Sequence, residues 1–243
     1  MLKTVDKATE TYARLLDTTL NDLNNKVVAT LGKAKTDRDR FDAATILNSR
    51  GDFITALRES GYTELANKHV EKYKQVIDEV KEDFKDLDLP PPKFTAANTE
   101  RLKAIARSDL ENFNAIGTDA MDTLRQELFR QAVAAEPFEN MVNKVREKTT
   151  GIGKDGSPLK NHSYTHANTA ILRFNGEVIR EAGDSLGAKK WEVVGPLDSV
   201  TRDVCRTALG DPIRTAEEWK AAGYWGGAPG GWNCRHQLYP VFK

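Results

Sequence analysis

Apolar side chains recur every three or four residues through most of residues 1–150, which is the spacing of one face of an α-helix. The longest such stripe starts after Leu2 and ends before Gly32, a residue that favours helix termination. It consists of Val5, Ala8, Tyr12, Leu16, Leu20, Leu23, Val27 and Leu31. The pattern predicts an amphipathic helix of about 30 residues.

Further helices follow with shorter stripes. One is expected from Asp39 to Ser60 with Gly61 as its stop, and another from Thr63 toward residues 90–92. The run of three prolines at 90–92 ends that segment, because proline cannot continue a helix, and is the best internal break of the region. Beyond it we expect a helix from residue 98 or 99, an interruption at residues 117–119, a continuation over 121–136, and a last short helix over 138–148.

The pattern changes after residue 150. Residues 151–160 are rich in glycine and turn formers, which is typical of a linker. A helix over 161–186 then precedes a β-branched, aromatic strand at 191–194, helices starting near Asp198 and Thr215, and a strand over 235–242. We expect helix 161–186 to cover the strands.

These patterns predict a mainly α chain in which long amphipathic helices precede a small α+β domain. Residues 1–150 would form a helical scaffold or partner-binding region, 151–160 a linker, and 161–243 the α+β domain. His69 lies on an apolar stripe and is interpreted as a core residue.

Composition narrows the function classes. The chain has 243 residues with 39% hydrophobic and 30% charged residues, and Lys+Arg and Asp+Glu both total 36. A net charge of zero argues against non-specific electrostatic binding of nucleic acid. No apolar run approaches the roughly 20 residues of a membrane helix, and two cysteines do not make a secreted disulfide framework. We therefore expect folding in a cytoplasm.

Residues 191–240 hold all four tryptophans and both cysteines, in the order W-E-V-V-G-P-L-D-S-V-T-R-D-V-C and later N-C-R-H-Q-L-Y-P. With T-H-A-N-T-A and L-G-A-K-K-W before it, this order resembles the Mu F-like family of phage head morphogenesis (minor head) proteins over residues 161–241. The residues that carry the resemblance are Trp191, Asp198, Thr201, Arg202, Asn233, Cys234 and Arg235.

The resemblance implies a low-copy structural protein of the virion. Such a minor capsid protein would be associated with the portal in the capsid interior, act in head assembly, and take part in genome packaging or delivery. Its expected partners are the portal protein and the major capsid protein, with genomic DNA as a further candidate and no membrane in the assembled head. It would be assembled in the host cytoplasm, and no enzymatic activity is implied.

One departure from the family pattern concerns metal ligands. Family members often carry His where this chain has Cys205 and Cys where it has His236, so a set of two Cys and one His survives the exchange. Zinc accepts thiolate and imidazole alike, and Cys234 and His236 would share one side of a strand. Asp198, His162 or His166 would be the fourth ligand. Free structural thiols and a Cys205–Cys234 disulfide remain alternatives.

Two other functions stay open. Cys205 or Cys234 could act as a nucleophile with His236 or His162 as base in an enzyme. A local basic patch could instead contact DNA, through Arg202, Arg206, Arg214 and Arg235. Asp198 is otherwise interpreted as a helix N-cap with Arg202 as its ion-pair partner.

Overall fold

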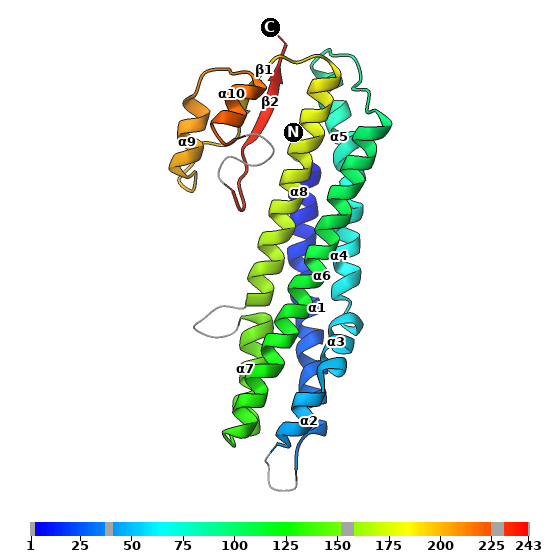
Figure 1. The fold of residues 1–243 in the computed structure, drawn as a ribbon, viewed down its shortest axis with the longest axis vertical. Helices are drawn as coiled ribbons and strands as arrows, with labels where there is room; N and C mark the ends of the chain where they lie inside the picture. Colours follow the sequence, from blue (N-terminus) through cyan, green and yellow to red (C-terminus); the bar gives the residue numbers. More distant parts are fainter. Residues whose placement is uncertain (1–2, 37–40, 152–157, 225–230, 243) are drawn as a thin grey trace. The chain divides into compact units, whose positions relative to one another are not determined.

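The computed structural model describes residues 3–36, 41–151, 158–224 and 231–242. The protein is mainly α-helical with a small two-stranded antiparallel sheet near the C-terminal end of the chain, which confirms the predicted fold class (Figure 1). It has two compact units. Unit 1 comprises Met1–Thr9, His69–Asp109 and Thr165–Lys243, and unit 2 comprises Glu10–Lys68 and Leu110–Tyr164. No helix within the described ranges combines the length and apolar character needed to cross a membrane.

The helices before the sheet follow the predicted apolar stripes. They are α1 (Lys3–Lys33), α2 (Ala43–Asn48), α3 (Arg50–Glu59), α4 (Tyr62–Glu71), α5 (Tyr73–Asp86), α6 (Ala96–Val133), α7 (Phe138–Thr150) and α8 (Pro158–Ser185). Every predicted stripe position of α1, from Val5 to Leu31, is buried. The stripe therefore identified the buried face of this helix correctly.

Two expected helices are each divided in the structure. Residues 39–60 contain α2 and α3, and Asp42 caps α2 by accepting a hydrogen bond from the Ala44 N–H. The expected start at Asp39 lies outside the described residues. The helix expected from Thr63 is divided at Lys72 into α4 and α5, although its apolar face stays buried on both sides. A stripe can continue across such a break because it records burial rather than backbone continuity.

The expected interruption at residues 117–119 is wrong, because α6 runs through it. A Cβ at Gly117 would lie 2.7 Å from Tyr62 Cε1 and 2.9 Å from Leu57 Cδ2. Within unit 2, the glycine thus allows α6 to approach α3 and α4 closely. A glycine inside a helical pattern can serve close packing as well as termination.

The expected linker is shorter than predicted. Gly151 ends α7 in the left-handed conformation, with φ of 80°. Residues 152–157 lie outside the described residues, and α8 begins at Pro158 rather than at Asn161. Proline suits the first turn of a helix because its missing N–H has no helical acceptor there. The division into 1–150, 151–160 and 161–243 stays a prediction, while the compact units divide the chain elsewhere.

The sheet of unit 1 pairs β1 (Lys190–Val194) with β2 (Gln237–Val241), and Trp191 lies opposite Pro240. Between the strands come α9 (Asp203–Gly210) and α10 (Ala216–Ala221) (Figure 1). Thr215 and Glu218 form the predicted capping box of α10. The expected helix start at Asp198 is wrong by five residues, because Asp198 forms a turn before α9.

One apolar core joins the sheet to helices of unit 1. The Gln237 side chain donates a hydrogen bond to the Leu172 carbonyl of α8 at 2.9 Å, so α8 covers the sheet as expected. The core includes Val5, Ala8, Tyr73, Val76, Val80, Phe84, Leu102, Phe174, Val178, Trp191, Trp219 and Tyr239. Residues from α1, α5 and α6 therefore complete the core that the sheet and α8 begin.

Candidate metal centre

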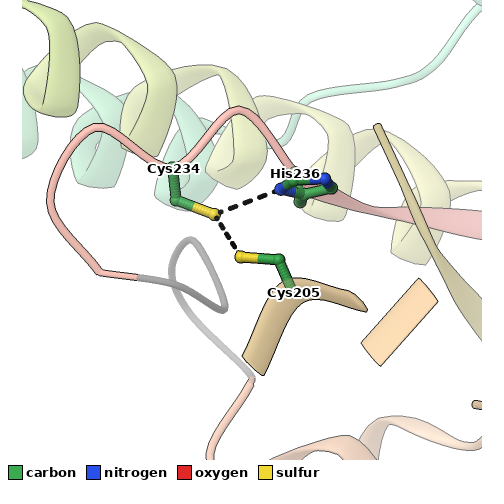
Figure 2. A group of neighbouring side chains, drawn as sticks. All are labelled: Cys205, Cys234 and His236. Atoms are coloured by element: carbon green, nitrogen blue, oxygen red, sulfur yellow. Dashed lines mark hydrogen bonds between the residues drawn. The ribbon is translucent and has the colours of Figure 1, made fainter. Parts of the chain in front are cut away.

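Cys205, Cys234 and His236 converge on one point in unit 1, as Figure 2 shows. Cys205 lies in the first turn of α9, and the other two lie in the segment that leads into β2. Their exposed fractions are only 2%, 4% and 2%. The Cys234 sulfur is 3.6 Å from the Cys205 sulfur and 3.6 Å from His236 Nδ1. All three candidate ligand atoms lie within 4.8 Å of one another.

Two contacts with α8 fix the segment that carries Cys234. The Asn233 N–H donates to Thr169 Oγ1 at 2.8 Å, and the Asn168 side chain donates to Asn233 Oδ1 at 3.0 Å. Asn233 has φ of 55°, a left-handed conformation that asparagine tolerates better than most residues. The asparagine before the cysteine thus turns the chain and anchors it, which places the Cys234 sulfur beside α9.

The tautomer of His236 follows from the hydrogen-bond partner of its Nε2 nitrogen. Nε2 lies 2.8 Å from the Pro196 carbonyl oxygen, which can only accept a hydrogen bond. Nε2 therefore carries the proton, and the Nδ1 lone pair faces the Cys234 sulfur. Metal-binding histidines are commonly oriented by such a hydrogen bond from the other ring nitrogen. Gly195 is needed beside this ring, because a Cβ there would collide with it.

Two of the three separations in the cluster fit a tetrahedral centre, and the third, from the Cys205 sulfur to His236, is no longer than 4.8 Å. With zinc–sulfur bonds of about 2.3 Å and a zinc–nitrogen bond of about 2.05 Å, tetrahedral angles give a sulfur–sulfur edge of about 3.75 Å and a sulfur–nitrogen edge of about 3.55 Å. The two observed separations are both 3.6 Å. The sulfurs are much farther apart than the roughly 2.05 Å of a disulfide bond, so no disulfide joins Cys205 and Cys234. The cluster could therefore hold a metal ion.

Burial affects the charge of this cluster. It raises the pKa of Cys205 to about 11, and the neighbouring Cys234 acts in the same direction. The Cys205 thiol is accordingly protonated at neutral pH when no cation is nearby. A bound divalent cation reverses this preference, because a coordinating thiol is deprotonated by the ion's charge.

Asp198 is not part of the three-residue cluster. Its carboxylate accepts hydrogen bonds from Arg235 Nη2 at 2.7 and 2.9 Å, and from Thr201 Oγ1 at 2.9 Å. The hydrogen bond from Arg235 is the main cause that lowers the pKa of this carboxyl. Asp198 therefore forms its ion pair with Arg235, whereas Arg202 was the expected partner. The Arg202 guanidinium instead donates a hydrogen bond to the Trp232 carbonyl.

Neither of the two histidines considered as a fourth ligand belongs to the described cluster. His166 Nε2 is 3.2 Å from the Asp109 carbonyl in unit 1, which gives this buried ring a partner away from the cysteines. His162 belongs to unit 2, where it lines a surface hollow with Asp119 and Lys148. Among the described residues, the cluster therefore comprises three candidate ligands.

The four arginines of the expected basic patch all have hydrogen-bond or ion-pair acceptors within unit 1. Arg206 donates to the backbone carbonyls of Asp198 and Thr201, and Arg214 pairs with Asp211 at 3.0 Å while lying over the Trp219 ring. Arg202 and Arg235 have the partners described above. These contacts give the guanidinium groups a structural role and do not favour a phosphate-binding patch.

The sequence indicated some of the groups that shape the centre and gave no sign of others. Trp191 was expected as a motif residue, and it is buried with its carbonyl accepting from the Trp219 indole N–H at 2.9 Å. The Pro196 carbonyl, however, was not expected to orient His236. Every residue has such a carbonyl, so only the fold reveals which one is used.

Comparison with known proteins gave no relatives. A scan against protein-family models found no match, and neither did searches of curated proteins and of solved structures. The likeness of residues 161–241 to the Mu F-like family stays a prediction.

Proposed function

We propose that this chain is a structural, low-copy phage minor head protein, with a zinc centre formed by Cys205, Cys234 and His236. It would act in head assembly inside the capsid, with the portal and major capsid proteins as partners and a further role in genome packaging or delivery. The resemblance of residues 161–241 to Mu F-like proteins supports the phage role. The observation that carries the structural role is that motif residues hold one another around the buried cluster.

Four contacts of this network support that interpretation. Asp198 binds Thr201 and Arg235 through its carboxylate, which connects the turn before α9 with the segment before β2. Arg202 links the same turn to the Trp232 carbonyl, and Asn233 binds α8. Motif residues that contact one another in this way stabilise a module rather than present side chains to a substrate.

Zinc is the metal that this donor set fits best. Thiolate and imidazole ligands in tetrahedral geometry are typical of zinc, whereas magnesium and calcium prefer oxygen ligands. A zinc ion would connect α9 with the segment before β2. Such a link can contribute directly to folding, because the unfolded chain does not hold its ligands together.

A Cys/His-dependent enzyme is the alternative that keeps some structural support. Cys234 and His236 are 3.6 Å apart and the ring is oriented by the Pro196 carbonyl, as in a nucleophile–base pair. Both sulfur-bearing residues are buried, however, so neither sulfur is placed to meet a bulky substrate. The burial favours the structural role.

The zinc centre can be tested on the full chain by elemental analysis after purification under reducing conditions. We expect about one equivalent of zinc in the native chain and less than about a tenth of an equivalent in His236→Gln, because a ligand is lost. Asp198→Asn is the matched control and should retain the metal. Native protein with less than about a tenth of an equivalent of zinc would contradict the centre.

The head-protein role has its own test. Particles purified from cells that carry the gene would be analysed by quantitative mass spectrometry. We expect the chain in the particles at far lower abundance than the major capsid protein, and recovered with the portal after capsid disruption. Recovery of the chain only from the particle-free fraction would contradict this role while leaving the zinc centre untouched.

A further inference from the structure

The sulfurs of Cys205 and Cys234 are near enough to form either of two links. At 3.6 Å they match the edge of a metal tetrahedron, and a disulfide needs them only about 1.5 Å closer. We propose that this pair is a reversible redox switch, in which a peroxide converts the metal-bound thiolates into a disulfide and releases the ion. The metal part of this inference rests on the proposed zinc centre.

The two cysteines are placed so that a short movement can join them. Cys205 is at the start of α9, whereas Cys234 lies in a turn outside the helices and strands, where its N–H donates to the Gly231 carbonyl at 3.2 Å. Figure 2 shows the two sulfurs facing each other, with the His236 ring beside the Cys234 sulfur and not between the two sulfurs. The sulfurs can therefore approach without displacing the imidazole.

The chemistry needs one two-electron oxidant, for which hydrogen peroxide is the simplest. One thiolate sulfur attacks a peroxide oxygen, the O–O bond breaks, and the departing hydroxide takes a proton to become water. The second thiolate attacks the resulting sulfenic sulfur, forms the S–S bond and expels hydroxide, which is protonated to a second water. Each sulfur has lost one electron and the peroxide has gained two. A disulfide sulfur is a poor metal ligand, so the ion leaves.

The metal-bound state and the disulfide state differ in what holds His236 and not in what holds α9. In both states a link joins α9 to the segment before β2, through the ion or through the S–S bond. Only the metal also holds Nδ1 of His236, whose other nitrogen stays bound to the Pro196 carbonyl. Oxidation would thus keep the module closed while removing the constraint on the imidazole.

The test uses the full chain loaded with zinc and then treated with hydrogen peroxide. Released zinc is measured with a chromogenic chelator, and the disulfide by intact mass and non-reducing peptide mapping. We expect one zinc released for each Cys205–Cys234 bond, a loss of about 2 Da relative to the reduced metal-free chain, and recovery with dithiothreitol and zinc.

Two variants make the outcome specific. His236→Gln keeps both thiols and should form the same disulfide without a zinc ion to release, whereas Cys205→Ser should form none. Thiols that stay reduced, or that gain oxygen without cross-linking, would overturn the switch. The zinc content before oxidation reports on the metal centre separately, so failure of that centre is distinguishable from failure of the thiols to cross-link.

Discussion

Gly183 of α8 lies so close to Trp191 of β1 that a Cβ at position 183 would come within 2.5 Å of the indole Cη2. The same Cβ would be 2.9 Å from Pro240 Cβ on the paired strand. The absence of a side chain on the helix is therefore what allows the sheet to rest on it. Trp191 is one of the largest fully buried side chains, so it has little room to move.

We predict that Gly183→Ala destabilises the protein by about 1–3 kcal/mol, because the added methyl forces the indole or the strand to shift. Urea unfolding measures the change. Gly51→Ala in α3 is the matched control, since no atom lies within 4 Å of the position of its Cβ and alanine favours a helix. Equal effects of the two substitutions would show that the contact with Trp191 does not restrict position 183.

Gly195→Ala should weaken metal binding without removing a ligand. Its Cβ would collide with the His236 ring, and a displaced ring no longer directs Nδ1 at the cysteines. We expect a roughly 10–100-fold loss of zinc affinity in a competition titration with a chelator, the range seen when ligand orientation is disturbed. Gly210→Ala, at the end of α9 with open space around it, should bind zinc like the native chain.

Arg173→Met should reveal an unpaired buried charge. Asp109 is fully buried, accepts a hydrogen bond from the Tyr73 hydroxyl at 3.0 Å and is paired with Arg173. Because the arginine side chain is partly exposed, we expect a loss of about 2 kcal/mol in unfolding free energy, below the usual cost for a buried pair. The double variant with Asp109→Asn should lose less than the sum of the single losses. Additive losses would contradict the coupling.

The pH dependence of stability should reflect His69. Burial lowers the pKa of this histidine from 6.5 to about 4, and His166 adds a smaller effect in the same direction. The hydrogen bond to the Ala167 carbonyl, 3.0 Å away, opposes the shift in pKa without cancelling it. The unfolded chain takes up the proton below about pH 6.5 and the folded chain only near pH 4, so stability is lost as pH falls through this interval. The loss would approach about 3 kcal/mol. His69→Gln should flatten the profile, except for the part contributed by His166.

The sequence predicted burial better than it predicted breaks. Val5, Leu20 and Leu31 are buried where their stripe placed them, because helical periodicity records directly which face is apolar. Gly117 was misread as an interruption, because its neighbours Tyr62 and Leu57 are distant in the sequence. The end of α4 at Glu71 has no glycine or proline to mark it, so the sequence carried no terminator signal for that boundary.

The residue types of the candidate site were predictable, but the ion pairs and hydrogen bonds that orient them were not. Cys205, Cys234 and His236 were proposed together because the resemblance to the Mu F-like pattern leaves two Cys and one His that suit one ion, and the structure brings them together. The sequence could not show whether Asp198 forms its ion pair with Arg235 or with Arg202. Arg202 is close to Asp198 along the chain, and Arg235 lies in the segment before β2 that the fold brings to it. Hydrogen bonds to backbone carbonyls, such as that of His236, have no residue signature at all.

The shared core of unit 1 also affects how genes for such proteins can exchange parts. Residues such as Val5, Val80 and Trp219 pack in one core, yet they come from three separate stretches of the chain. A crossover that replaced only the stretch from residue 165 onward would pair a new sheet with old side chains from α1 and α5. Because interiors tolerate few changes of volume, such hybrids would fold well only when both parents filled that core alike. Recombination should therefore preserve the three stretches as a set.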